Sequence, residues 1–163
     1  MATSDLIQYL ETEQFSALPG GAPEAVGVAT LNRRKVETFV ATGPIAIGQV
    51  VSLDASQTGD GDKGIKVSLG DTGSNDTVFA VGVALTAAAA SGDKVDVCIR
   101  GICEAQVDAN ALKGNALYLT GTAGQLDDVA PAAPLSESVP VAQCMEDKGA
   151  GAGLTTVFVI GRF

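Results

Sequence analysis

Short segments of alternating apolar and polar residues fill the chain from about residue 34 to its C-terminus. The first four are KVETFVAT, QVVSLDA, GIKVSL and TVFAVGVAL, and the next four are KVDVCIRGICEAQV, NALYLT, SVPVAQCM and TTVFVIGRF. They are rich in β-branched residues, and Gly, Asp, Asn or Ser separates them. About seven or eight such segments predict an all-β fold, either a small β-barrel or a β-sandwich.

The predicted strands form two similar series. IGQVVSLDAS, FAVGVAL and VDVCIRG are echoed by KGNALYLTGTAG, VPVAQCM and TVFVIGR. Each series has a Gly five residues before a Leu and ends in a Gly: Gly48, Leu53 and Gly101, then Gly114, Leu119 and Gly161. We interpret them as pseudo-duplicated β-units, residues 47–101 and 113–161, that close a shared core within a β-domain of residues 36–163. Chance similarity among Val-rich strands is the alternative.

Residues 1–35 follow a different pattern. Leu6, Ile7 and Leu10 have the spacing of one face of a short helix, and the preceding Ser4 and Asp5 are good N-caps. FSALPGGAPEAVG then favours extended or turn backbone, because it contains two prolines and three glycines. Isolated helices shorter than ~12 residues are marginal in water. We therefore predict an extended N-terminal arm that can form a short helix and gains order by packing on its own β-domain, a sister subunit or a larger surface.

Composition and charge narrow the range of partners. The apolar residues are mostly Ala and Val, so the predicted core consists of small and β-branched side chains. The formal net charge is −9, which repels nucleic-acid backbones and anionic membranes, and we expect neither as a partner. The charge also serves solubility. No apolar run approaches the ~20 residues of a membrane span, and the N-terminus lacks the basic region of a secretory signal.

The three cysteines form no CxxC pair. Cys98 and Cys103 are five residues apart on one predicted strand, so we expect them to face opposite sides of a sheet and not to bridge each other. We interpret these two and Cys144 as small buried hydrophobic residues of a protein made in a reducing cytoplasm. A disulfide or a redox role is the alternative.

A search for catalytic chemistry gives a negative expectation. The chain has no histidine, which excludes Ser-His-Asp and Cys-His arrangements and zinc sites with His ligands. The Gly-rich segments TGDGDKG and GAGAGLT lack the strand-to-helix context of a phosphate loop. Asp60, Asp62 and Asp71 lack the spacing and the terminal Glu of a calcium loop. We therefore expect no enzyme, no cofactor and no metal ion.

The order of these segments resembles that of the phage capsid cement, or head decoration, protein family. The resemblance covers about residues 36 to 163, in ETFVATGPIAIGQVVSLDAS, VFAVGVALTAAAASGDKVDVCIRGICEAQVDANALKGNALYLT, GQLDDV and VPVAQCMEDKGAGAGLTTVFVIGRF. The residues that match the family pattern are Val81, Gly82, Val83, Ala84, Gly92, Val95, Val97, Gly101, Gly114 and Tyr118. Gln49 and Asn115 stand where the family commonly has Asp, and Pro140 and Gln143 replace a Gly and a hydrophobic residue.

The resemblance implies a virion protein that coats the outer surface of an assembled capsid and stabilises it across capsomer joints. Its partner would be the major capsid protein, and it would assemble as a homo-oligomer, for which we expect a trimer. The predicted contacts with capsid or sister subunit are Leu6, Ile7, Tyr9, Leu10, Phe15, Arg33 and Arg34. The alternative is a carbohydrate- or receptor-binding β-module on a virion or cell surface. Such modules stack sugars on exposed aromatic rings, and the chain has no Trp and two Tyr.

Overall fold

The computed structural model describes residues 34–73, 79–129 and 139–161. The chain divides into two compact units, Met1–Arg33 and Arg34–Phe163, and the described residues all belong to the second. They form nine strands and a single helix of four residues, which confirms the predicted all-β fold. Within these residues, no helix is long and apolar enough to cross a membrane.

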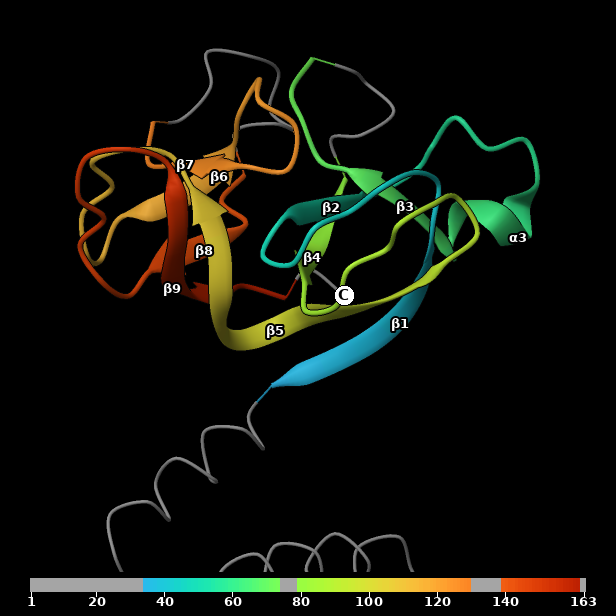
Figure 1. Cartoon of the computed structure of the whole chain (residues 1–163), viewed down its shortest axis with the longest axis horizontal. Helices are drawn as coiled ribbons and strands as arrows, with labels where there is room; N and C mark the ends of the chain where they lie inside the picture. The colour runs from blue at the N-terminus through green and yellow to red at the C-terminus, as the bar shows by residue number, and fades with distance from the viewer. Residues whose placement is uncertain (1–33, 74–78, 130–138, 162–163) are drawn as a thin grey trace, which may run out of the picture. The chain divides into compact units, whose positions relative to one another are not determined.

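Five strands pair in a closed ring, the first ring, which is a small β-barrel (Figure 1). In the order of pairing they are β1, β3, β2, β4 and the N-terminal half of β5, and β5 closes the ring by pairing with β1. The β1–β3 pair is parallel and the other pairs are antiparallel. The elements are β1 (Lys35–Ala41), β2 (Val50–Leu53), α3 (Asp60–Lys63), β3 (Lys66–Leu69), β4 (Ala80–Ala84) and β5 (Lys94–Val107).

A second ring is built on the C-terminal half of β5. Its strands pair in the order β5, β7, β6, β8 and β9, and β9 closes the ring on β5. The long β5 therefore belongs to both rings, and Figure 1 shows it running from the strands of the first ring to those of the second. The strands that complete this ring are β6 (Ala116–Leu119), β7 (Leu126–Asp127), β8 (Ala142–Cys144) and β9 (Gly153–Val159).

The two rings have the same topology. β1, β2, β3, β4 and the first half of β5 correspond to the second half of β5, β6, β7, β8 and β9. Three backbone hydrogen bonds recur at equivalent positions in the two rings. Gly48 N–H donates to Ala84 O in the first ring and Gly114 N–H to Cys144 O in the second, both at 2.8 Å. Ala84 N–H to Gln49 O and Cys144 N–H to Asn115 O form the second pair, both at 2.9 Å, and Ala88 N–H to Ile45 O (2.9 Å) and Lys148 N–H to Ala111 O (2.8 Å) form the third. The first ring begins at β1 and the second at the C-terminal half of β5, and each of these strands precedes the start of the corresponding repeat predicted from the sequence. The repeat boundaries at residues 47–101 and 113–161 therefore stay a prediction.

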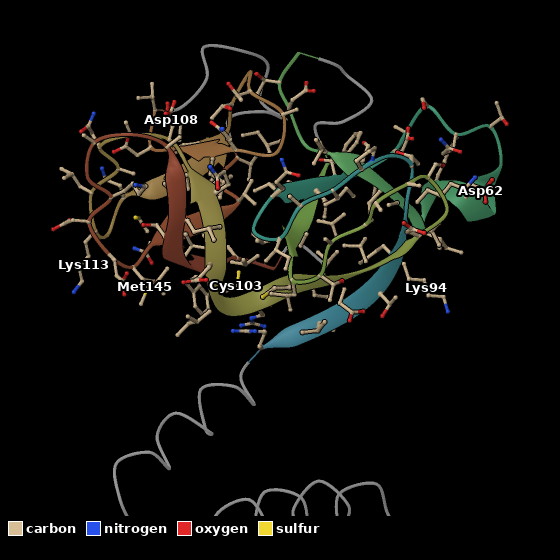
Figure 2. All side chains as sticks on the ribbon, in the orientation of Figure 1. Asp62, Lys94, Cys103, Asp108, Lys113 and Met145 are labelled. Atoms are coloured by element: carbon tan, nitrogen blue, oxygen red, sulfur yellow. The ribbon has the colours of Figure 1, made fainter. Side chains whose placement is uncertain are left out.

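A bend in β5 at Gly101 allows one strand to serve both rings. Up to Arg100 the strand pairs with β1, and from Gly101 onward it pairs with β9. Gly101 is buried and has φ 111°, a backbone conformation that residues with a Cβ rarely adopt. Cys103, labelled in Figure 2, lies at this bend.

The bend brings together two cysteines that lie on opposite faces of β5, because Cys98 belongs to the outer face of the first ring and Cys103 to the interior of the second. Both thiols are buried in the same apolar cluster and hydrogen-bond each other. Apart from Cys98, the buried positions of β5 are the odd-numbered ones on both sides of Gly101, so the contact comes from the change in strand direction at this glycine and not from a change in alternation. The expectation that all three cysteines are buried is confirmed.

The core consists of two apolar clusters. One fills the inside of the first ring and includes Phe39, Val51, Val67 and Ile99. The other fills the second ring, and it also includes side chains from the outer face of the first ring, namely Val50, Ala80, Val83 and Cys98. The first ring therefore packs its outer face on the interior of the second, which joins the rings through buried apolar area as well as through β5.

Candidate interaction surface

The second ring has a covered end, which we call the second-ring mouth and define by Cys103, Leu119, Val141 and Val159. All four side chains are at most 3% exposed. The outer face of the first ring covers this end, where Cys98 contacts Cys103 and the backbone of Gly70 lies against the Leu119 side chain.

Backbone hydrogen bonds fix the first ring on this mouth. Thr72 N–H donates to Thr120 O at 2.9 Å, and Gly124 N–H donates to Gly70 O at 2.8 Å. Val50 N–H also donates to Gly124 O, at 3.0 Å. Three hydrogen bonds between loops and strand ends, together with apolar packing, make a specific contact between the two halves.

The corresponding end of the first ring, which we call the first-ring mouth, is not covered by the second ring in the described part of the chain. It encloses a cavity of about 180 Å³ that is lined by Glu37, Phe39, Leu53, Gly64, Val81 and Ile99. The two mouths occupy equivalent positions in their rings. Glu37 of the first-ring mouth pairs with Val97, and Cys103 of the second-ring mouth pairs with Val157, which is the counterpart of Val97 in the second ring. In the same way Leu53 pairs with Val67, and Leu119 pairs with Leu126.

Large apolar side chains stand next to the first-ring mouth. Val36 is 43% exposed and precedes Glu37, and Ile65 is 53% exposed and follows Gly64. Phe79 is 50% exposed, and its carbonyl oxygen accepts a hydrogen bond from Leu53 N–H at 3.0 Å. An apolar cavity with apolar side chains at its edge is typical of an interaction site.

The described charged groups near this mouth form solvated ion pairs. Lys35 Nζ lies 2.9 Å from Glu37 Oε1, and both side chains are about half exposed, so the ion pair contributes little to stability. At α3, Lys66 Nζ lies 3.2 Å from Asp62 Oδ2. Figure 2 shows Asp62 on this helix, at the periphery of the first ring.

A buried carboxylate shapes the loop that connects β2 to α3. Asp54 accepts hydrogen bonds from Ser56 N–H at 3.0 Å, from Ser56 Oγ at 2.5 Å and from Gln57 Nε2 at 2.8 Å. Burial raises the pKa of Asp54, but these hydrogen bonds outweigh it and lower the pKa below 3.8. Asp54 therefore stays ionised and holds the loop beside Leu53.

Among the predicted contact residues, only Arg34 belongs to the described part of the chain. Leu6, Ile7, Tyr9, Leu10, Phe15 and Arg33 lie outside the described residues, and their role stays a prediction. Arg34 is half-buried, and its Nε donates to Ile102 O at 2.8 Å. This bond fixes the residue just before β1 against the bend of β5.

The thiols at the bend differ from each other in acidity. Their mutual hydrogen bond lowers the pKa of Cys98 and raises that of Cys103, and burial also raises that of Cys103. The nearby Arg34 guanidinium lowers both. In the part of the chain that the structure covers, no group of three or more His, Cys, Asp or Glu side chains could hold a metal ion.

Sequence reasoning missed the first-ring mouth, although the sequence contains one signal for it. Alternation along KVETFVA places Glu37 on the same face as the buried Phe39 and Ala41. A carboxylate in an inward-facing register indicates that the strand leaves the core at that point. The openness of the mouth follows from how the two rings pack, which periodicity does not encode.

Comparisons with known proteins show limited similarity. No protein-family model matches the chain, and no curated protein matches it. One similar solved structure is titled "The crystal structure of head fiber gp8.5 N base in bacteriophage phi29". It has 18% sequence identity and a TM-score of 0.49, over 78% of this chain and 94% of the other.

Proposed function

We propose that this chain is a non-enzymatic structural protein of a phage virion that binds the outer surface of the assembled capsid and stabilises it across capsomer joints. The observation that carries the proposal is the position of the residues that resemble the cement family. Val81, Gly82, Val83 and Ala84 form most of β4, Val95 and Val97 lie in β5, and Gly101 forms its bend. The resemblance thus falls on the strands that close the first ring and join it to the second.

The architecture suits a protein that is placed under mechanical tension. Each strand of the two rings has a paired neighbour on both sides, so neither ring has an open sheet edge. Open edges invite pairing with other chains, and closure removes them. Such a body transmits force between contact points and resists aggregation at the high local concentration of a capsid surface.

Preferential binding to the assembled state accounts for stabilisation. A protein that binds across capsomer joints, and not to free capsid subunits, shifts the equilibrium towards the assembled capsid. Many identical copies on one capsid add their effects, and linked contacts strengthen attachment through multivalency.

The N-terminal arm is the proposed contact with the major capsid protein. Arg34, at the start of the β-domain, is held by its hydrogen bond to Ile102. The apolar residues proposed for the contact are Leu6, Ile7, Tyr9, Leu10 and Phe15.

Co-sedimentation with empty capsids assembled from the cognate major capsid protein tests this function. The full chain should sediment with capsids, and a chain lacking residues 1–20 should remain in the supernatant while retaining the β-sheet signal in its circular dichroism spectrum. The variant Leu6→Asp, Ile7→Asp, Leu10→Asp should also fail to bind.

A matched control is Thr3→Asp, Gln8→Asp, Gln14→Asp, which adds the same charge to the arm and should still bind. Unimpaired binding by the truncated chain would refute the role of the arm. Binding to immobilised glycans, without binding to capsids, would support the carbohydrate-binding alternative instead.

A further inference from the structure

We propose that the first-ring mouth binds the outer face of the second ring of another copy of this chain, so that copies associate head to tail. This interaction concerns the purified protein alone and does not depend on capsid binding. Within one chain, the outer face of the first ring already covers the second-ring mouth. Between copies, the outer face of the second ring would cover the first-ring mouth in the same way.

Strand register identifies the face that would do the covering. In the first ring, Val50 pairs with Val83 and Val83 pairs with Cys98, which gives the row that packs on the second ring. In the second ring, Ala116 pairs with Gln143 and Gln143 pairs with Phe158. The row Ala116, Gln143 and Phe158 is therefore the counterpart of Val50, Val83 and Cys98.

Exposure distinguishes the two rows. Val50, Val83 and Cys98 are fully buried, because the second ring lies on them. Ala116 and Phe158 are partly exposed and Gln143 is exposed. Ile102 pairs with Phe158 and extends this outer face with another partly exposed apolar side chain.

The two surfaces have compatible chemistry. The first-ring mouth offers Phe39, Leu53, Val81 and Ile99 around its cavity, and the outer face of the second ring offers Phe158 as its largest side chain. Phe158 takes the place of the smaller Cys98, and the cavity of the first-ring mouth can accommodate the larger phenyl side chain. Burying these apolar groups against each other would favour association through the hydrophobic effect.

One difference between the rings affects the edge of the contact. The connection from β2 to β3 spans residues 54–65 and contains α3, whereas the connection from β6 to β7 spans residues 120–125. Leu53 pairs with Val67 as Leu119 pairs with Leu126, so Ile65, two residues before Val67, corresponds to Gly124, two residues before Leu126. An exposed apolar residue thus borders the first-ring mouth, and we expect it to contact the second copy.

The contact is heterologous, because the first-ring mouth of one copy meets a different surface, the outer face of the second ring, on the next copy. Such contacts give a closed ring or an open chain of copies, depending on the rotation between neighbours. Three copies would place six pseudo-equivalent rings in one assembly. A monomer with both surfaces unused is the outcome that the proposal excludes.

The contact between Cys98 and Cys103 supplies a specific test. Their counterparts across the proposed interface are Phe158 of one copy and Glu37 of the next. Glu37→Cys and Phe158→Cys would be made separately, mixed and oxidised with copper phenanthroline, which takes two electrons and two protons from each thiol pair. Non-reducing electrophoresis should show a disulfide-linked dimer in the mixture and little in either variant alone.

Matched controls separate this contact from random collision. Thr38→Cys is the neighbouring exposed position on β1, and its mixture with Phe158→Cys should give several-fold less dimer. The substitution Gln143→Arg places a charge at an exposed position of the second ring, so folding should be preserved. It should lower the mass that light scattering measures for the purified protein.

Three outcomes would overturn the proposal. The first is equal crosslinking in the Thr38→Cys and Glu37→Cys mixtures. The second is a wild-type protein that remains monomeric at all concentrations tested. The third is preferential crosslinking of Glu37→Cys to Leu10→Cys, which would assign the first-ring mouth to the N-terminal arm.

Discussion

The thiols of Cys98 and Cys103 hydrogen-bond each other although the two residues are five positions apart on one strand. The contact exists because β5 bends at Gly101 as it passes from the first ring to the second. It also marks the place where the outer face of the first ring covers the second-ring mouth.

Replacement of Gly101 should destabilise both rings together. With φ at 111°, a side chain at this position strains the backbone, and Gly101→Ala should lower the free energy of unfolding by about 1–3 kcal/mol. Urea unfolding followed by circular dichroism measures the change. Gly61→Ala in α3 is the control, since a Cβ there meets no atom within 4 Å. A loss at Gly61 equal to that at Gly101 would contradict the strain argument.

Alkaline pH should weaken the fold through two of the buried thiols, Cys103 and Cys144. Burial, with a smaller contribution from neighbouring carboxylates, raises the pKa of Cys144 above 9.0, and the pKa of Cys103 is raised as well. The unfolded chain then loses these protons at lower pH than the folded one, so stability is complete below about pH 9 and decreases above it. Urea midpoints between about pH 8 and 10 should fall less steeply in Cys144→Ala. An identical slope in the variant would refute the assignment.

Acid should act on the loop beside the first-ring mouth. Because the pKa of Asp54 is lowered from 3.8, its contribution to stability is present above pH 3.8 and is lost as pH falls through the lower, folded-state pKa. Asp54→Ala should cost about 1–3 kcal/mol at neutral pH, since it removes three hydrogen bonds. The variant should also show a flatter acid limb in urea midpoints. A parallel acid limb would show that another carboxylate dominates.

Removal of a buried hydroxyl should stabilise the protein. The Oγ atoms of Ser52 and Ser68, a cross-strand pair on β2 and β3, are buried without a hydrogen-bond partner. Ser52→Ala should therefore raise the free energy of unfolding by up to about 1 kcal/mol. Ser56→Ala, which removes a partner of Asp54, should lower it. Thermal unfolding of both variants gives the comparison, and a lower midpoint for Ser52→Ala would contradict the expectation.

Much of the strand content is visible in the sequence because β-branched residues alternate with polar ones. KVDVCIRGICEAQV was interpreted as one strand, and it is β5, Lys94–Val107. The two-residue β7 and the four-residue α3 were not predicted, since elements so short have no measurable period. Gly101 inside a strand pattern was a signal for a bend, because isolated glycines in strands often mark bulges.

The candidate surface was harder to predict than the strands. It depends on the pairing of β1 with β5 and of β5 with β9, which brings together residues such as Thr38 and Asp96, and Gly101 and Val159. Such pairings are non-local, and alternation within a strand does not choose the partner. The position of Glu37, on the same face of β1 as Phe39 and Ala41, was a local signal for this mouth, because Cys103 occupies the corresponding position in the second ring.

The most direct test of the proposed function is the stability of capsids with and without this protein. Empty capsids would be heated in its presence, and their disassembly followed by light scattering, with free capsid subunits assayed for binding in parallel. Stabilisation of the assembled state predicts a higher disassembly temperature at saturating protein and no binding to free subunits. An unchanged disassembly temperature, or equal binding to free subunits and capsids, would contradict it.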